Sequence, residues 1–186
     1  MHKIVCLTGP SGVGKTSYAK RLCHMKGFSV PRVATTRQRR ADDGPQYVYV
    51  CRDVFLRMVG DSTFIEHDAY LSYYYGTFRE DVISPVIGSQ AVVLDLTPRG
   101  VEQVVRVIPD AIVIVIQPDD PTWLLTRLRE RGTQEESEIL DRQKNLIEFL
   151  KQLDRLPGTR VSASYSPSSW DQTFQEILDS IGVVTF

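Results

Sequence analysis

The sequence predicts an α/β fold in which helices cover both faces of a central parallel sheet. Short apolar runs alternate with longer amphipathic segments along most of the 186-residue chain, which is typical of strands and helices that follow one another in this class. The run from Ala111 to Ile116 is continuously apolar, as expected of a strand that is buried on both faces. A chain of this length can bury one domain-sized core. We therefore expect a three-layer α/β/α domain.

Four apolar runs are predicted strands, and five amphipathic segments are predicted helices. The strands are residues 3–8, 91–96, 111–116 and 159–163. The helices are residues 14–25, 97–107, 120–131, 135–153 and 169–181. In the helix 120–131, Trp123, Leu124 and Leu128 share one face, and arginines lie around the rest of the helix.

Two segments interrupt the alternation of strands and helices. Residues 33–88 hold the turn Asp42-Asp43-Gly44-Pro45 and the aromatic run 70–75, and predict a small inserted lobe of short strands and turns. Residues 132–137 are polar and predict a loop between two helices. We expect one domain over residues 1–186, divided into a core (1–32, 89–131 and 143–186), the lobe (about 33–88) and a lid (about 132–142).

The composition excludes several classes of protein. Lys and Arg total 22 and Asp and Glu total 23, so the net charge of −1 lacks the basic excess of a general nucleic-acid binder. The three cysteines and three histidines are scattered, without the spacing of a disulfide framework or a zinc site. The first apolar run is too short for a secretory signal or a membrane span. We expect a cytoplasmic protein that binds neither nucleic acid nor membranes.

A phosphate-binding loop is the strongest motif in the chain. It lies between the first strand and the first helix. Its glycines permit a tight turn that gathers backbone N–H groups around phosphate oxygens, and the helix N-terminus adds a favourable dipole. We expect Lys15 to reach the β and γ phosphates of ATP, and the Thr16 hydroxyl to bind Mg²⁺. The candidate nucleotide-binding residues are Gly9, Ser11, Gly12, Val13, Gly14, Lys15 and Thr16. The set also includes position 17, which is counted as a second threonine.

Asp95 is a second candidate magnesium ligand. It lies near the carboxyl end of the predicted strand 91–96, at the edge where open α/β sheets bind ligands. A carboxylate at that edge can hold Mg²⁺ or its water ligands. The alternative is that Asp95 caps the following helix, although Thr97 can do so equally well.

Three arginines are candidates for stabilising phosphoryl transfer. Arg127 and Arg131 are four residues apart, so they share a helix face and can point at one anion. Arg142 follows the polar loop, and we expect it to reach the site only when that loop closes. A solvated basic face explains these arginines equally well, with acidic partners at Glu130, Glu135 and Glu138.

The predicted lobe combines arginines with tyrosines. Arg37, Arg39 and Arg40 lie close in sequence, and guanidinium groups supported by phenol hydroxyls suit a terminal phosphate monoester. Glu66 can accept paired hydrogen bonds from a guanine edge. A nucleic-acid surface uses the same residue types, but the net charge and the presence of a single cluster argue against it. The tyrosines are Tyr47, Tyr49, Tyr70, Tyr73, Tyr74 and Tyr75.

Together these motifs resemble those of the guanylate kinase family, a group of nucleoside monophosphate kinases with a P-loop NTPase fold. The resemblance implies that Arg37, Arg40, Tyr47 and Tyr75 bind the acceptor phosphate and that Glu66 reads guanine with Thr77 beside it. It also implies that Arg127, Arg131 and Arg142 are catalytic and lid arginines. We also expect Asp95 to be a substrate-binding residue. The matching segments occur in the family's order between Ile4 and about Arg142, and they are Gly9–Thr16, Thr35-Thr36-Arg37 with Arg40, Asp43-Gly44 before Tyr47, Phe64-Ile65-Glu66, Tyr74-Tyr75-Gly76-Thr77, Leu94-Asp95, and Arg131-Gly132-Thr133 with Glu136-Ser137.

Two positions depart from the family pattern. Val33 stands where the family usually has a serine that contacts the base. Thr97 stands where the family has a second aspartate, two positions after Asp95. If Glu66 reads the base alone, we expect weaker discrimination, because a polar site rejects wrong ligands by leaving buried groups unpaired.

These observations predict an ATP- and Mg²⁺-dependent kinase whose acceptor is GMP or dGMP. One alternative keeps the kinase and changes the acceptor to a modified nucleotide or a sugar phosphate, as in the related ribose bisphosphate kinases. Glu66 and Tyr47 argue against a sugar phosphate, whereas Val33 and Thr97 leave it open.

A different alternative is an inactive guanylate-kinase-like module that binds a protein partner. Such modules typically have a degraded phosphate-binding loop. Lys15, Thr16 and the lid arginines are all present here, which favours the enzyme. The sequence is compatible with a monomer and with a homodimer.

Overall fold

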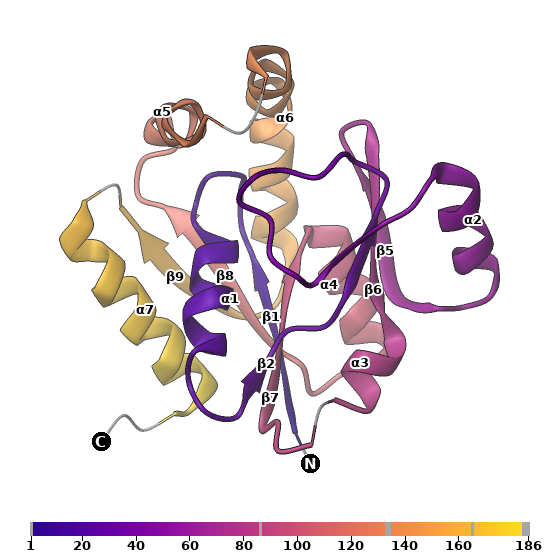
Figure 1. The fold of residues 1–186 in the computed structure, drawn as a ribbon. Coiled ribbons are helices and arrows are strands. Elements are labelled where there is room, and N and C mark those ends of the chain that lie inside the picture. The colour runs from indigo at the N-terminus through magenta and orange to yellow at the C-terminus, as the bar shows by residue number, and fades with distance from the viewer. Residues whose placement is uncertain (1, 86, 133–134, 165, 184–186) are drawn as a thin grey trace.

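A computed structural model describes residues 2–85, 87–132, 135–164 and 166–183 of the chain. A five-stranded sheet forms its centre, with the strand order β2, β7, β1, β8, β9 and parallel pairing between all neighbours. This arrangement confirms the predicted α/β class (Figure 1). The strands are β1 (Lys3–Thr8), β2 (Phe28–Ser29), β7 (Ala91–Leu96), β8 (Ile112–Pro118) and β9 (Thr159–Ala163).

Helices cover both faces of the central sheet (Figure 1). Side chains alternate between the two faces along a strand, so β1 contributes to two core layers. Val5 and Leu7 pack with α1 and α7, whereas Ile4 and Cys6 pack with α4 and α6. The helices of this part are α1 (Lys15–Cys23), α4 (Pro98–Val107), α5 (Thr122–Arg131), α6 (Glu136–Arg155) and α7 (Pro167–Ile181).

A second sheet lies between β2 and β7 in the chain and projects to one side of the central sheet (Figure 1). Its strand order is β4, β3, β6, β5, with one parallel and two antiparallel pairings. Ala34, Phe55 and Phe64 form its own small core. Its elements are β3 (Val33–Thr35), β4 (Tyr47–Tyr49), α2 (Arg52–Gly60), β5 (Phe64–Tyr70), β6 (Tyr73–Phe78) and α3 (Arg79–Ile83).

The helices α2 and α3 differ from the prediction, which placed only short strands and turns between residues 33 and 88. Phe55, Met58 and Val59 recur at helical spacing and pack together within the lobe. One side of α2 therefore has a tertiary partner, and this burial stabilises a nine-residue helix that is too short to be stable alone.

Strand β2 was not predicted, whereas the other elements of the central part shift by only a few residues. The strand predicted at 111–116 is observed at Ile112–Pro118, and the helix predicted at 135–153 is observed at Glu136–Arg155. Gly132 caps α5 in the left-handed conformation. The predicted polar loop 132–137 is shorter because α6 begins at Glu136, and residues 133–134 lie outside the described part. Trp123, Leu124 and Leu128, which were predicted to share one face of this helix, are all buried in α5. In the described ranges, no helix combines the length and apolar character needed to span a membrane.

Candidate active site

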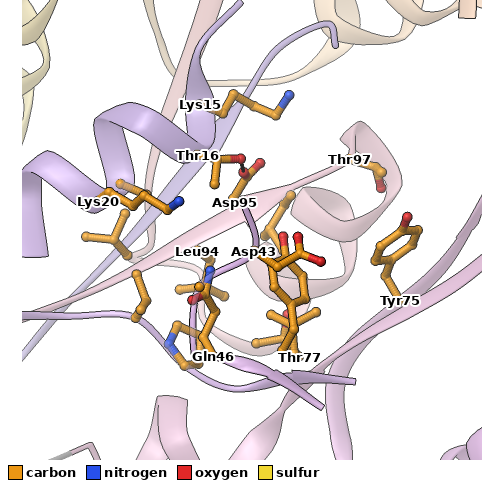
Figure 2. Close-up of a pocket in the computed structure, with 18 of the residues that line it drawn as sticks. Lys15, Thr16, Lys20, Asp43, Gln46, Tyr75, Thr77, Leu94, Asp95 and Thr97 are labelled. Atoms are coloured by element: carbon orange, nitrogen blue, oxygen red, sulfur yellow. Dashed lines mark hydrogen bonds between the residues drawn. The ribbon is translucent and has the colours of Figure 1, made fainter. Parts of the chain in front are cut away.

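A cavity of about 770 Å³ lies between the carboxyl edge of the central sheet and the lobe, a size that suits a nucleotide-sized ligand. Figure 2 shows Lys15, Thr16 and Asp95 on one side of it, and Asp43 and Thr77 on the other. Segments far apart in the sequence therefore face one space. The predicted site residues that line the cavity are Gly9, Ser11, Lys15, Thr16, Arg37, Arg40, Tyr47, Glu66, Tyr75, Thr77, Asp95 and Arg142.

The phosphate-binding loop connects β1 to α1. Gly14 immediately precedes the helix with φ of +104°, which only glycine adopts readily. A Cβ at Gly14 would lie 2.8 Å from the Trp170 ring, so the loop passes close to α7. Lys15 Nζ donates hydrogen bonds to the carbonyl oxygens of Gly9 (2.8 Å) and Pro10 (3.2 Å). These bonds hold the ammonium group against the loop.

The assignment of a threonine at position 17 is wrong. The residue there is a serine, Ser17, and it is not among the residues that line the cavity. Its side chain is exposed in the first turn of α1, where its N–H donates a 2.9 Å hydrogen bond to the Gly14 carbonyl oxygen. Successive residues of a helix point about 100° apart, so the helix that aims Thr16 into the cavity turns Ser17 away from it. Ser17 is therefore not placed to contact a ligand in this cavity.

Thr16 and Asp95 lie in contact beside this loop. The Thr16 hydroxyl donates a 2.6 Å hydrogen bond to Asp95 Oδ2 (Figure 2). The parallel register that pairs Leu7 with Asp95 brings the end of β7 next to the loop. Thr97 is the residue that caps α4, since its Oγ1 accepts a 3.1 Å hydrogen bond from the Gly100 N–H. Capping therefore does not account for Asp95.

The oxygen atoms of Thr16 and Asp95 fit a magnesium ion. Mg²⁺ prefers oxygen ligands and usually takes only one or two from protein side chains, completing its shell with water and phosphate oxygens. Within the described residues, no group of three or more His, Cys, Asp or Glu side chains is gathered as a metal cage. The donor set thus suits an ion that binds together with a phosphate ligand.

Arg37 forms a buried ion pair with Asp43. Its Nη1 and Nη2 donate 2.6 Å hydrogen bonds to the two carboxylate oxygens, and both side chains are only 4% exposed. Tyr49 and the Arg40 N–H donate to the same carboxylate. Burial by itself raises the pKa of Asp43, but these hydrogen bonds hold that pKa well below its usual range. In the part of the chain that the structure describes, Arg37 Nε is buried with no hydrogen-bond partner.

Glu138 connects the lobe to α6. Its Oε1 accepts hydrogen bonds from Arg40 Nη2 (2.6 Å) and Arg142 Nη2 (2.7 Å). Arg142 also donates to Ser11 Oγ in the phosphate-binding loop. The sequence predicts that Arg142 reaches the site only after loop closure. The structure places Arg142 at the phosphate-binding loop, because α6 begins at Glu136 and carries Arg142 over that loop. The dependence of this position on loop closure stays a prediction.

Three further predicted site residues remain, and the structure describes the side chains of two of them, Arg127 and Val13. Arg127 is not among the residues that line the cavity, and its guanidinium carbon lies 5.3 Å from the centroid of the Trp170 ring. The backbone of Arg131 ends α5, but its side chain lies outside the described part, so the shared face of the two arginines stays a prediction. Val13 is fully buried in the core, which leaves only its backbone for a ligand.

Two tyrosines border the arginines of the lobe. The guanidinium carbon of Arg37 lies 4.8 Å from the centroid of the Tyr47 ring. Burial raises the pKa of Tyr75, and the positive charges of Arg37, Arg40 and Arg142 partly offset this effect. Burial, followed by the charge of Asp95, raises the pKa of Tyr47. Both hydroxyls therefore remain hydrogen-bond donors at neutral pH.

Glu66 lies at the lobe end of the cavity, where it is 5% exposed. Thr77 donates to Glu66 Oε1 through its N–H at 3.1 Å and through its hydroxyl. Burial raises the pKa of Glu66 to about 7 in spite of these two hydrogen bonds. A Cβ at position 100 would lie 2.7 Å from Glu66 Oε2, so Gly100 allows α4 to approach the carboxyl group closely.

The two departures from the family pattern have different surroundings. Val33 lines the cavity as an apolar side chain. Thr97 donates a 2.6 Å hydrogen bond to Asp68 Oδ2, and Asp68 lines the same cavity as Glu66. Sequence reasoning missed Asp68, although its position two residues after Glu66 places both side chains on one face of a strand. It also missed Asp43 as the partner of Arg37, because several arginines lie within reach in the sequence and nothing local selects among them.

Comparisons with known proteins agree with this arrangement. Residues 1–155 match the family model described as guanylate kinase. The chain is 34% identical over 148 residues to a guanylate kinase of Hydrogenovibrio crunogenus, a match that covers 78% of this chain and 72% of that relative. It is 35% identical over 144 residues to a guanylate kinase of Synechococcus sp., covering 75% of this chain and 78% of the relative. Its fold is similar to the crystal structure of guanylate kinase from Anaplasma phagocytophilum, with a TM-score of 0.71 and 19% identity over 99% of this chain and 88% of that one. The chain belongs to the guanylate kinase family.

Proposed function

We propose that this protein catalyses the ATP-dependent phosphorylation of GMP, or of dGMP, to the nucleoside diphosphate. The observation that carries the proposal is that Lys15 of the phosphate-binding loop and Arg37 and Glu66 of the lobe line one cavity. A phosphate donor and a purine monophosphate acceptor can therefore bind face to face. Family membership and the relatives named guanylate kinase support the same acceptor.

In this proposal, the phosphate donor ATP binds at the phosphate-binding loop. The backbone N–H groups of residues 9–16 surround the ATP phosphates, and Lys15 exchanges its contacts with loop carbonyls for phosphate oxygens. Thr16 and Asp95 would hold Mg²⁺, which when bound neutralises charge on the β and γ phosphates.

The acceptor end belongs to the lobe. Arg37, Arg40, Tyr47 and Tyr75 bind the phosphate of the monophosphate. A guanidinium group has five N–H donors, so Arg37 can contact this phosphate while Asp43 holds it in place. Glu66 accepts N–H groups of the base, and its backbone and hydroxyl bonds to Thr77 orient the carboxyl group.

Phosphoryl transfer then proceeds without a covalent enzyme intermediate. An oxygen of the acceptor phosphate forms a bond to the γ phosphorus, while the bond from that phosphorus to the bridging oxygen breaks and ADP leaves. Lys15 and Arg142 stabilise the negative charge on the moving group, and we assign a supporting role to Arg127 and Arg131. The lobe (about 33–88) and the lid (about 132–142) cover the core during the reaction and exclude water, which would otherwise compete as an acceptor.

A coupled assay of ADP release tests this function. With ATP and Mg²⁺, a panel of nucleoside and sugar monophosphates is expected to give the highest turnover with GMP or dGMP. Lys15→Ala is expected to lower kcat by at least about 100-fold with an unchanged thermal unfolding midpoint. Lys151→Ala, on the exposed side of α6, is the matched control and is expected to retain wild-type turnover.

Three results of this assay would count against the proposal. Near-normal turnover of Lys15→Ala would contradict the assigned donor site. Highest turnover with a sugar phosphate would favour the alternative acceptor. If no acceptor in the panel supports ADP release, the result would favour the inactive interaction module.

A further inference from the structure

One face of β5 and β6 presents a row of polar side chains to the lobe end of the cavity, where the proposed function places the purine base. Glu66 and Asp68 are two residues apart on β5, so their side chains project from the same face of the strand. The register pairs Glu66 with Thr77 and Asp68 with Tyr75, and directly opposed residues share a face. All four line the cavity. Asp68 therefore lies beside Glu66 in the site.

Helix α4 holds Asp68 in position. Thr97 Oγ1 donates to Asp68 Oδ2 at 2.6 Å, and the Ala69 N–H donates to Oδ1 at 2.8 Å. Gln103 donates to the His67 carbonyl oxygen at 2.8 Å and accepts from the His67 N–H at 3.2 Å. The strand residue between the two carboxyl groups is thus clamped to α4. Clamping of this kind keeps a recognition group within the narrow geometric range that specificity requires.

The charge of Asp68 is only weakly compensated by neighbouring side chains. Arg99 Nη1 lies 3.8 Å from Oδ1, but the Arg99 side chain is 72% exposed, and such exposed pairs contribute little. The Asp68 side chain itself is 11% exposed. Each carboxylate oxygen can accept more than one hydrogen bond, so Asp68 retains acceptor capacity beyond its contacts with Thr97 and Ala69.

Two neighbouring carboxyl groups match a ligand edge that carries adjacent N–H donors. Guanine has such an edge, with its N1–H next to the exocyclic amino group at C2. Hypoxanthine keeps the N1–H and lacks the amino group, whereas adenine has an unprotonated N1. We propose that Asp68 is a specificity-determining residue that accepts a hydrogen bond from the 2-amino group while Glu66 accepts the N1–H, with Thr97 as the positioning residue of Asp68. The inference rests on the proposed function and identifies the part of the purine that the site selects.

Asp68 would supply the second carboxylate that is absent at position 97, where this chain has Thr97. The second carboxylate comes from β5 instead of the start of α4, and Thr97 bonds to it across 29 residues of sequence. Discrimination between bases then no longer depends on Glu66 alone.

The test compares GMP with IMP, which differs from it only in lacking the 2-amino group. Asp68→Asn keeps an oxygen that can accept the Thr97 hydrogen bond, so the strand should stay in place. It is expected to lower kcat/KM for GMP about 10- to 100-fold, the range for removal of an ionic acceptor, and to change kcat/KM for IMP by less than about threefold. Asp110→Asn makes the same chemical change in an exposed turn before β8 and is expected to leave both values unchanged.

Variants at position 97 test the positioning role. Thr97→Ala removes the hydroxyl and is expected to lower the GMP-to-IMP ratio of kcat/KM by a smaller factor than Asp68→Asn. Thr97→Ser keeps the hydroxyl and is expected to preserve the wild-type ratio. If Asp68→Asn does not fold, this pair still decides the question, since the proposal requires the ratio to fall in Thr97→Ala alone.

A purely structural role of Asp68 predicts a different result. Asp68→Asn would then lower the values for GMP and IMP by the same factor, or change neither, and the unaltered ratio would overturn the proposal. Failure of the wild-type protein to phosphorylate GMP would overturn the proposed function instead. In that case calorimetric dissociation constants for GMP and IMP provide the same ratio, and an unchanged ratio in Asp68→Asn again overturns the role of Asp68.

Discussion

Arg37 and Asp43 form a bidentate ion pair in which each side chain is 4% exposed. Both residues come from the lobe, six positions apart in the chain. A buried arginine with a fixed plane presents its remaining N–H groups in one direction. The lobe therefore orients the arginine that we assign to the acceptor phosphate before any phosphate is bound.

Removal of Asp43 is expected to destabilise the protein. Asp43→Ala leaves the Arg37 charge buried without its partner, and such a loss costs about 3–5 kcal/mol in the free energy of unfolding. Urea-induced unfolding measures this change. Asp171→Ala breaks a well-formed but exposed ion pair with Arg21 and is expected to change stability little. Equal losses in the free energy of unfolding for the two substitutions would contradict the larger contribution that we expect from the buried pair.

The same ion pair makes the free energy of unfolding depend on pH in the acidic range. Because the pKa of Asp43 is lowered in the folded protein, its contribution to stability is fully present above the ordinary aspartate pKa of about 3.9 and is lost as the pH falls below it. Urea unfolding at a series of pH values should show a steeper loss of stability below about pH 4 in the wild type than in Asp43→Ala. Parallel curves for the two proteins would rule out this linkage.

Binding of GMP is expected to strengthen as the pH rises from 6 to 8. The pKa of Glu66 is about 7, and the ionised carboxylate is a much stronger acceptor for an N–H group of the base than the protonated acid. Below pH 7 the dissociation constant should therefore increase by about tenfold per pH unit. The phosphate of GMP titrates in a similar range, so Glu66→Gln serves as the control that retains the phosphate effect alone. Calorimetric titrations with identical pH profiles for both proteins would exclude ionisation of Glu66 as the cause.

Loss of either proposed magnesium ligand is expected to raise the Mg²⁺ concentration needed for turnover. Thr16→Val removes the hydroxyl oxygen, and Asp95→Asn removes one carboxylate oxygen and the negative charge from the pair joined by the 2.6 Å hydrogen bond. In each variant the half-saturating Mg²⁺ concentration should rise about 10- to 100-fold. Thr16→Ser keeps the hydroxyl and should behave as the wild type. Chelation of the metal should abolish turnover of all these proteins, and an unshifted Mg²⁺ dependence in Asp95→Asn would remove Asp95 from the site.

The bridge through Glu138 is expected to hold the lobe against α6. Its Oε1 binds both Arg40 and Arg142, and an uncharged amide cannot compensate two guanidinium groups. Glu138→Gln should therefore accelerate amide hydrogen exchange in residues 37–43 and 138–142. Glu148→Gln, on the exposed side of the same helix, is the control. Unchanged protection in Glu138→Gln would mean that other contacts keep these segments together.

The α/β class, four of the five strands of the central sheet, the phosphate-binding loop and the candidate carboxylates could all be predicted from the amino-acid sequence. These features depend on local information: the continuous apolar run of β8, the spacing of Trp123, Leu124 and Leu128, and the glycines between β1 and α1 are all visible within one segment.

The contacts between the candidate side chains could not be predicted from local sequence and become visible only in the folded protein. Asp68 reaches Thr97 across 29 residues, and Arg142 reaches Ser11 across 131. Helix α2 likewise depends on the packing of Phe55 in the lobe. Such contacts follow from how the lobe and α6 lie against the central sheet, and the free energy that selects this arrangement comes from burial spread over many residues, which no single segment of the sequence displays.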